Sequence, residues 1–363
     1  MKISVRELAK ALDAEVVGNP DLQISGPAEP ATATADQIAL AMQPVYAEAL
    51  GKGKARVAIL WNGADWRALG LEAAIFVPRP RYALAGVNGI FGRAPEVDAG
   101  IHETALVADD AEIGEGAAIG PFVVIGRGVK IGPNARILSH SSIAEEAVIG
   151  ANALLYNGVR IGARVVIGDD FICHSNAAIG NDGFSFVSPE PGVVEEARAE
   201  MQVRTEHRDT EYVRINSLGT VIIGDRVEIG AGATLDRGTI ADTVIGEGSK
   251  LDNMVHIGHN VRVGRNCLLC GQVGIAGSST IGDGSVLAGQ VGVADHVSVG
   301  ENVVAAGQTG ITSNVPPNRM IMGNPAVKMD TQVDMYKALR RLPRLAKKVA
   351  ELEARLSKTD TND

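Results

Sequence analysis

Two histidines lie close together in a polar stretch of the second half of the chain. The stretch from Asp252 to Val261 reads Asp-Asn-Met-Val-His-Ile-Gly-His-Asn-Val and contains His256 and His259. Imidazole is the usual side chain for accepting a proton near neutral pH, because its ordinary pKa is about 6.5. His259 is therefore a candidate general base; the alternative is that both histidines are surface residues without a role.

Metal binding by the same two histidines is the less favoured interpretation. Their three-residue spacing forms a ligand pair on a helix, whereas we expect an extended chain here. The three cysteines have no zinc spacing, and the string Cys267-x-x-Cys270 falls inside a repeat that explains it without redox chemistry. We therefore expect no metal and no cofactor.

The element that positions these residues is a repeat of six. Aliphatic residues recur at this interval, mostly followed by glycine, and a small or apolar residue comes four positions later. The first run is Ile101, Val107, Ile113, Ile119, Ile125, Ile131, Ile137, Ile143, Ile149, Leu155, Ile161, Ile167, Cys173 and Ile179. The second is Thr239, Ile245, Leu251, Ile257, Val263, Leu269, Ile275, Ile281, Leu287, Val293, Val299, Ala305 and Ile311. A helix repeats at 3.6 residues and a strand at 2, so neither alone explains this period.

A period of six fits a three-sided parallel β-helix, with three hexads in a coil of roughly 18 residues. The aliphatic residue points inward, and we expect the following glycine to turn the corner with a positive φ. His259 then lies at a corner, and Gly277, one coil later, stacks beside it. The N–H of Gly277 is a candidate oxyanion donor, although a plain corner glycine is an equal alternative. His296 lies at another corner further on.

The repeat divides the chain into three parts. Residues 1–98 lack it and predict a small α/β domain, with a capping box at Ser4-x-x-Glu7. Residues 99–316 form the β-helix, interrupted by an excursion at about 181–218 and by a two-residue slip between Leu235 and Thr239. Residues 317–363 form a helical extension, which Pro343 should break into two helices.

Composition narrows the class of protein. The formal net charge of −9 argues against general nucleic-acid binding. The start of the chain lacks the apolar core of a signal peptide, and no stretch approaches the ~18 apolar residues of a membrane span. With three cysteines, this predicts a cytoplasmic, reducing compartment.

Three segments resemble one family. They are Asp252–Asn253 through Val261, Ile179-Gly-Asn-Asp-Gly-Phe184 and Val221 to Gly230. All are similar to motifs of the UDP-3-O-(3-hydroxyacyl)glucosamine N-acyltransferases of lipid A biosynthesis, which are hexapeptide-repeat acyltransferases. The resemblance extends over essentially the whole chain. It implies a left-handed β-helix, a homotrimer with active sites between neighbouring β-helices, and transfer of a 3-hydroxyacyl group from acyl carrier protein to the sugar 2-amine.

The resemblance also implies roles for individual residues. His259 matches the general base, and Gly277 lies where the family supplies an oxyanion donor. Asp252 matches an acidic residue that orients the base, and His296 a histidine near the donor and substrate phosphates. Together with His256, these two residues are the expected substrate contacts of the β-helix.

The family's N-terminal domain clasps the uridine. Tyr46 matches the aromatic residue that stacks on uracil, and stacking on an aromatic face contributes ~1–3 kcal/mol. Gln43 stands where the family pattern has Asn, and Leu40 where it has Phe. Gln43 and Tyr46 are therefore the expected nucleotide contacts.

The tail suggests a partner. Nine Lys/Arg and four Asp/Glu lie between Lys328 and Lys358 of this acidic chain. Arg340, Arg341 and Arg344 are candidates for docking an acidic acyl carrier protein. The equal alternative is that they form the solvated face of a helix bundle.

Two other functions remain open. Another hexapeptide transferase, such as a UDP-N-acetylglucosamine O-acyltransferase, shares the repeat but starts directly with coils. The other alternative is a non-enzymatic scaffold or a γ-carbonic-anhydrase-like metal protein, and the latter needs three histidines that converge on zinc across a subunit interface. The N-terminal domain favours the N-acyltransferase.

Overall fold

The computed structural model describes residues 2–190, 211–323 and 326–359, with side chains described up to residue 355. The middle of the predicted excursion and the end of the chain lie outside these residues. The chain divides into two compact units, Met1–Glu96 and Val97–Asp363. Within the described part, no helix has both the length and the apolar character that crossing a bilayer requires.

The first unit is a small α/β structure around a mixed five-stranded sheet. Its sheet order is β2 (Glu15–Gly18), β7 (Ala73–Phe76), β6 (Val57–Leu60), β5 (Ile38–Ala41) and β4 (Pro27–Ala28), and β1 (Ile3–Ser4) pairs separately with β3 (Gln23–Ile24). Its helices are α1 (Val5–Ala11), the 3-10 helix η1 (Pro44–Tyr46), α2 (Ala47–Leu50) and α3 (Pro80–Phe91). Each face of the sheet covers its own apolar cluster.

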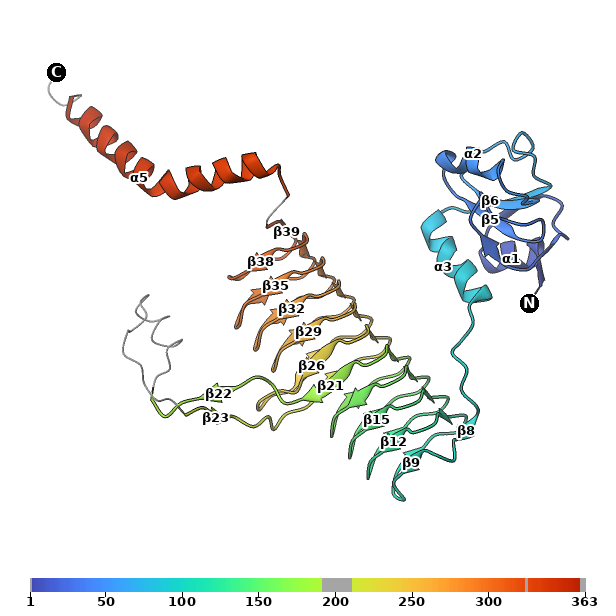
Figure 1. Cartoon of the computed structure of the whole chain (residues 1–363), viewed down its shortest axis with the longest axis horizontal. Coiled ribbons are helices and arrows are strands. Elements are labelled where there is room, and N and C mark those ends of the chain that lie inside the picture. Colours follow the sequence, from blue (N-terminus) through green and yellow to red (C-terminus); the bar gives the residue numbers. More distant parts are fainter. Residues whose placement is uncertain (1, 191–210, 324–325, 360–363) are drawn as a thin grey trace. The chain divides into compact units, whose positions relative to one another are not determined.

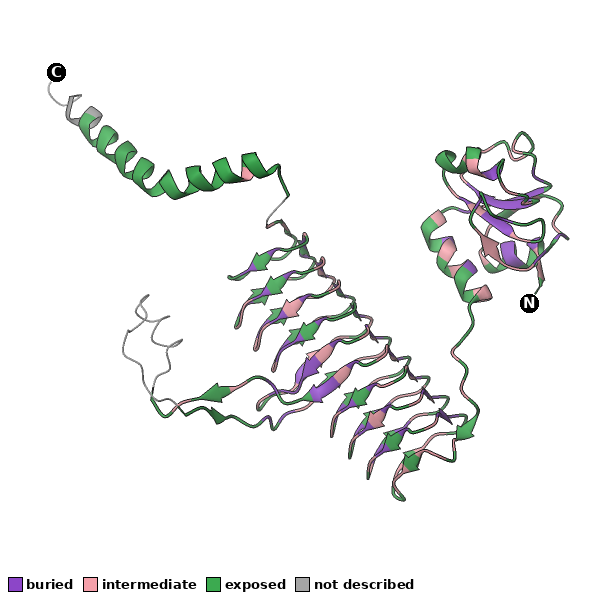
Figure 2. Cartoon of the chain, viewed as in Figure 1, coloured by how far each residue is buried: buried purple, intermediate pink, exposed green. Residues whose placement is uncertain are grey.

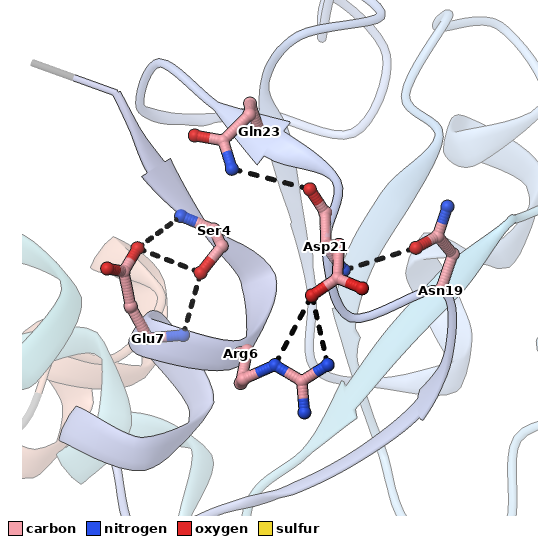
Figure 3. Close-up of polar contacts among 6 residues, drawn as sticks. All are labelled: Ser4, Arg6, Glu7, Asn19, Asp21 and Gln23. Carbon is pink, nitrogen blue, oxygen red and sulfur yellow. Dashed lines mark hydrogen bonds and ion pairs between the residues drawn. The ribbon is translucent and has the colours of Figure 1, made fainter.

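Helix α1 begins with the predicted capping box. The Ser4 hydroxyl accepts a hydrogen bond from the Glu7 N–H at 3.2 Å, and the Glu7 carboxylate accepts one from the Ser4 N–H at 2.7 Å (Figure 3). The first turn is also tied to a neighbouring loop, because the Arg6 guanidinium donates to Asp21 at 2.9 Å. The capping box satisfies backbone N–H groups at the helix start that lack partners within the helix.

The second unit is a parallel β-solenoid with three sheets, as the repeat of six predicts (Figure 1). The first sheet contains β10 (Glu112–Ile113), β13 (Lys130–Ile131), β16 (Val148–Ile149), β19 (Val166–Ile167), β24 (Val221–Ile223), β27 (Thr243–Ile245), β30 (Arg262–Val263), β33 (Thr280–Ile281) and β36 (Ser298–Val299). The second contains β8 (Gly100–Ile101), β11 (Ala118–Ile119), β14 (Arg136–Ile137), β17 (Leu154–Leu155), β20 (Ile172–Cys173), β25 (Glu228–Ile229), β28 (Lys250–Leu251), β31 (Leu268–Leu269), β34 (Val286–Leu287), β37 (Val304–Ala305) and β39 (Met320–Ile321). The third contains β9 (Leu106–Val107), β12 (Val124–Ile125), β15 (Ser142–Ile143), β18 (Arg160–Ile161), β21 (Ala178–Asn181), β26 (Thr234–Asp236), β29 (His256–Ile257), β32 (Gly274–Ile275), β35 (Gly292–Val293) and β38 (Gly310–Ile311). The left-handed winding stays a prediction.

The core of the solenoid is one continuous apolar cluster. Each repeat's aliphatic residue pairs with its equivalent one coil later, as Ile257 does with Ile275. These inward residues are buried, whereas the preceding strand residue usually faces outward (Figure 2). The period therefore arises because residues 18 apart stack on one another inside the coil.

The glycines that follow the aliphatic residues are needed for a different reason from the predicted positive φ. Gly120 and Gly126 do not have a positive φ; the left-handed position comes two residues later, as at Asn134 and Asn152 in other repeats. Instead, a Cβ at Gly126 would lie 2.9 Å from a backbone nitrogen of the next coil. Glycine is needed there because neighbouring coils approach closely.

The irregularity after Leu235 is larger than predicted. Leu235 pairs with Ile257, 22 positions later, and Ile223 pairs with Ile245 at the same interval. The coil therefore carries four extra residues rather than a two-residue slip. Thr239 lies within the lengthened corner, so its inclusion among the inward residues was wrong.

The excursion leaves the coils between β21 and β24. Its described part contains an antiparallel pair, β22 (Phe186–Val187) and β23 (Val213–Arg214), seen beside the solenoid in Figure 1. The tail forms a single helix, α5 (Met329–Thr359), so the predicted break at Pro343 was wrong. The helix bends instead (Figure 1), which is the usual consequence of a proline that removes one backbone donor.

Candidate functional site

A groove of about 520 Å³ runs along the third sheet of the solenoid. Its floor is open because His256 is followed, in register on the next two coils, by Gly274 and Gly292. The lining residues are Phe184, Asp236, His256, Gly258, His259, Gly274, Ala276, Gly277, Gly292, Val293 and Ala294. The groove therefore joins two imidazoles and one carboxylate to a wall of small and apolar residues.

The imidazole of His259 is held through its Nδ1 atom. Nδ1 lies 3.0 Å from Oδ1 of Asn260 and 3.3 Å from the hydroxyl of Thr239. The Asn260 amide is oriented by two further bonds, because Oδ1 accepts the Thr239 N–H and Nδ2 donates to the Ala241 carbonyl. Since an amide oxygen only accepts, Nδ1 is the donor in this pair, and in the neutral imidazole the lone pair is then on Nε2. His259 is thus set up to receive a proton at Nε2.

Gly277 lies beside Nε2, as the spacing of one coil predicts. A Cβ at position 277 would be 2.6 Å from His259 Nε2, and the adjoining Ser278 N–H donates to the His259 carbonyl at 2.9 Å. Among the described residues, none accepts a hydrogen bond from the Gly277 N–H. Gly277 and the Nε2 edge of the His259 imidazole therefore lie side by side in the lining of the groove.

Asp236 is the site residue that the sequence did not reveal. It is 7% exposed, and its Oδ2 lies 3.7 Å from Nε2 of His256. Burial raises the pKa of its carboxyl, the imidazoles of His256 and His259 oppose the rise, and Asp182 adds to it. The available signal was the irregular corner that begins at this residue.

Asp252 does not line the groove of His259. It lines a second pocket of about 500 Å³ together with His174, Glu228 and Cys270. Nε2 of His174 is hydrogen-bonded to a carboxylate oxygen of Glu228 at 2.9 Å, and the ring stacks on Tyr156. Within one chain, the carboxylate in the groove of His259 is therefore Asp236 rather than Asp252, whose role stays a prediction.

The other predicted residues are placed as follows. His296 is exposed at a left-handed corner, and its N–H donates to the Gly277 carbonyl at 3.1 Å. Gln43 is the N-cap of η1 in the first unit, and Tyr46 ends that helix with 40% of its surface exposed. The arginines of the tail, Arg340, Arg341 and Arg344, are exposed on α5.

Metal binding was one of the alternatives. In the described ranges, no group of three or more His, Cys, Asp or Glu side chains is arranged to hold a metal ion. Cys267 is buried in an inward position of the solenoid and Cys270 is half-buried, and both are free thiols. The described geometry thus offers acid–base chemistry at the groove.

Known proteins resemble the chain throughout its length. The family models described as bacterial transferase hexapeptide (six repeats) and GMPPB C-terminal domain match residues 242–277 and 101–184. A UDP-3-O-acylglucosamine N-acyltransferase of Ruegeria pomeroyi is 58% identical over 358 residues, 99% of each chain. The chain belongs to the UDP-3-O-acylglucosamine N-acyltransferase family. The Paracoccus denitrificans protein of that name is 53% identical, over 99% of this chain and 98% of that one.

Membership of this family makes the chain an acyltransferase, as its motifs predict. A solved structure of an Arabidopsis UDP-N-acetylglucosamine acyltransferase covers 62% of this chain and 71% of that one, with a TM-score of 0.52 and 21% identity. This likeness concerns the fold alone and agrees with the parallel solenoid described above.

Proposed function

We propose that the protein transfers a 3-hydroxyacyl group from acyl carrier protein to the 2-amine of UDP-3-O-(3-hydroxyacyl)glucosamine, a step of lipid A biosynthesis. The names of relatives that match over nearly the whole chain support the substrate class. The observation that carries the chemistry is the His259 imidazole, with Nδ1–H bonded to Asn260 and Nε2 open to the groove.

The reaction needs one base and one oxyanion donor. The sugar amine attacks the thioester carbonyl while His259 Nε2 accepts the proton that the nitrogen loses. The Gly277 N–H donates to the oxygen of the tetrahedral intermediate, where negative charge develops. The carbon–sulfur bond then breaks, and the proton on Nε2 passes to the departing thiolate. The imidazole thus ends the cycle neutral, and no cofactor takes part.

The wall of the groove suits a fatty chain. Gly274, Ala276, Gly292 and Ala294 present little side chain, and Val293 adds apolar surface. A flexible alkyl group gains roughly 25 cal/mol for each Å² of apolar surface that it covers. This part of the groove is therefore the proposed place for the acyl chain, with the thioester at the end nearest His259.

The remaining contacts follow the family pattern. Tyr46 and Gln43 bind the uracil, and Asp252, His256 and His296 contact the sugar and phosphates. The cationic face of α5, with Arg340 and Arg341, attracts the acidic carrier protein. A homotrimer brings the second pocket of one subunit to the groove of another, which gives Asp252 access to the substrate.

The acceptor decides the function. Purified protein is supplied with 3-hydroxyacyl carrier protein and either UDP-3-O-acylglucosamine or UDP-N-acetylglucosamine, and the products are identified by mass spectrometry. The proposal expects an amide product from the first acceptor only. An ester formed on UDP-N-acetylglucosamine, without the amide, would instead identify an O-acyltransferase.

A further inference from the structure

The entry to the excursion touches the candidate base. Gly183 follows β21 by two residues and is buried. A Cβ built at Gly183 would lie 2.9 Å from Cβ, 3.3 Å from Cγ and 3.2 Å from Cδ2 of His259. The backbone of the excursion therefore packs directly against one side of the His259 side chain.

Glycine is required at this position by contact rather than by backbone conformation. The φ of Gly183 lies outside the left-handed region, whereas Gly180, three residues earlier, has a φ of 86°. An alanine at 183 therefore keeps an ordinary backbone conformation and adds only a methyl group, which would press on the imidazole. This makes position 183 a clean place for a steric test.

The segment that carries Gly183 is firmly anchored. The Gly183 N–H donates to the hydroxyl of Ser217, a buried residue where the excursion returns to the coils, at 3.3 Å. Arg237 is 8% exposed, and its guanidinium donates to the carbonyls of Gly180 at 2.9 Å and Ala163 at 2.8 Å. Its own N–H donates to the Asn181 carbonyl at 2.8 Å.

The lengthened corner and the excursion thus serve the same site. Arg237 belongs to the corner with four extra residues, and it fixes the point where the excursion departs. Thr239, from the same corner, contacts Nδ1 of His259. Two interruptions that are far apart in the sequence meet on opposite sides of one imidazole.

We propose that Gly183 is a positioning residue, which holds the His259 imidazole in the orientation that bonds Nδ1–H to Asn260 and points Nε2 at Gly277. The ring is limited on its Cγ–Cδ2 side by Gly183, at Nδ1 by Asn260 and at Nε2 by Gly277. With no Cβ at 183, the backbone approaches the ring closely and limits its movement on that side. This inference rests on the proposed function, because it assigns His259 the role of base.

The test is Gly183→Ala, measured in two ways. We expect kcat to fall by roughly 100-fold, since a base displaced by about 1 Å loses rate on that scale, while KM for the acyl donor stays within about twofold. The second measurement is the nitrogen spectrum of ¹⁵N-histidine protein, with the His259 signals assigned from His259→Ala. In the wild type these signals report a proton on Nδ1; in Gly183→Ala they move towards a mixture of tautomers.

Two further variants keep the test decisive. Gly126→Ala places a methyl 2.9 Å from a backbone nitrogen at a corner remote from the groove, and thus controls for general strain in the solenoid. It should leave kcat and the His259 signals unchanged. Ser217→Ala removes the hydroxyl that accepts the Gly183 N–H, and we expect a smaller change in both measurements. If Gly183→Ala does not fold, Ser217→Ala decides the matter.

The inference would be overturned, even if activity fell, by unchanged His259 signals in Gly183→Ala. If Gly183→Ala does not fold, unchanged His259 signals in Ser217→Ala would overturn it. Unchanged kcat in a folded Gly183→Ala would do the same. Absence of acyl transfer by the wild type would count against the proposed function alone, because the nitrogen spectrum reads the imidazole without any substrate.

Discussion

The Nε2 atom of His259 faces Gly277 so closely that a Cβ at position 277 would lie 2.6 Å from it. A Cβ atom essentially never lies within 3.0 Å of a heavy atom to which it is not bonded. Gly277→Ala should therefore push the imidazole away from the reacting centre and lower kcat by roughly 100-fold or more. Steady-state kinetics of the purified variant would measure this.

A matched control for Gly277→Ala exists twelve residues later. Gly289 occupies the same position of its repeat, two residues after an inward aliphatic, but a Cβ there meets only the Gly271 carbonyl at 3.5 Å. Gly289→Ala should keep the rate of the wild type. Equal activity of the two variants would mean that the space beside Nε2 is not needed.

Asn260 is expected to matter because it fixes the tautomer of the base. Asn260→Gly removes the acceptor for Nδ1–H, while glycine tolerates the left-handed φ of 61° at this corner. A hydrogen bond to the imidazolium that forms in the reaction contributes about 1.5–3 kcal/mol, so kcat should fall roughly 10- to 100-fold. Asn260→Asp keeps an acceptor and should retain most of the activity. The opposite order of the two variants would contradict this assignment.

Asp236 should make stability depend on pH. Burial raises the pKa of its carboxyl, so the native state binds a proton more tightly than the unfolded chain. This contribution to stability is complete below the unfolded pKa and is lost as pH rises through the folded pKa. Asp236→Asn does not show this loss of stability, so its melting temperature relative to wild type should rise as pH increases above about 4, the ordinary pKa of Asp.

The pH series needs one control. The charged groups that interact with the Asp236 carboxyl are His256, His259 and Asp182. All three are present in both the wild type and Asp236→Asn. Asp252→Asn removes an exposed carboxylate in another pocket and is the control for the loss of one negative charge. A melting-temperature difference for Asp236→Asn that does not change with pH would mean that the ionisation of Asp236 is not coupled to folding.

Phe171 is the largest side chain that is fully buried in the solenoid. Truncation to alanine leaves a cavity in a core that cannot collapse without breaking the stack of coils. Phe171→Ala should lower the free energy of unfolding by about 3–5 kcal/mol. Leu106→Ala, at an outward strand position that is 69% exposed, should lie within about 0.5 kcal/mol of wild type in the same denaturant titration.

The repeat could be predicted because it follows from residue types at short, regular spacing in the sequence. Each inward residue must be aliphatic wherever a coil passes over it, so Ile257 and Ile275 identify the stack without any long-range information. The position of Gly277 beside His259 follows from the same spacing, because the two residues are 18 positions, or one coil, apart. The family motifs then supplied the expected chemistry, and relatives that match over the whole chain confirm the acyltransferase class.

Other features depend on contacts that a periodic pattern does not contain. The corner glycines avoid the backbone of the next coil, a distance that is set by stacking rather than by φ. Asp236 reaches the groove, and Gly183 reaches the side chain of His259, only because a lengthened corner and the excursion meet there. Pro343 bends α5 without ending it, although its missing N–H breaks the pattern of backbone bonds.

The most direct test of the account is the rate of acyl transfer by His259→Ala, with His140→Ala, a histidine at a corner outside the groove, as the control. The account predicts that His259→Ala lowers kcat by roughly 10²–10⁴ while the melting temperature stays close to that of the wild type, and that His140→Ala leaves kcat unchanged. A folded His259→Ala protein that forms the amide at the rate of the wild type would contradict the account.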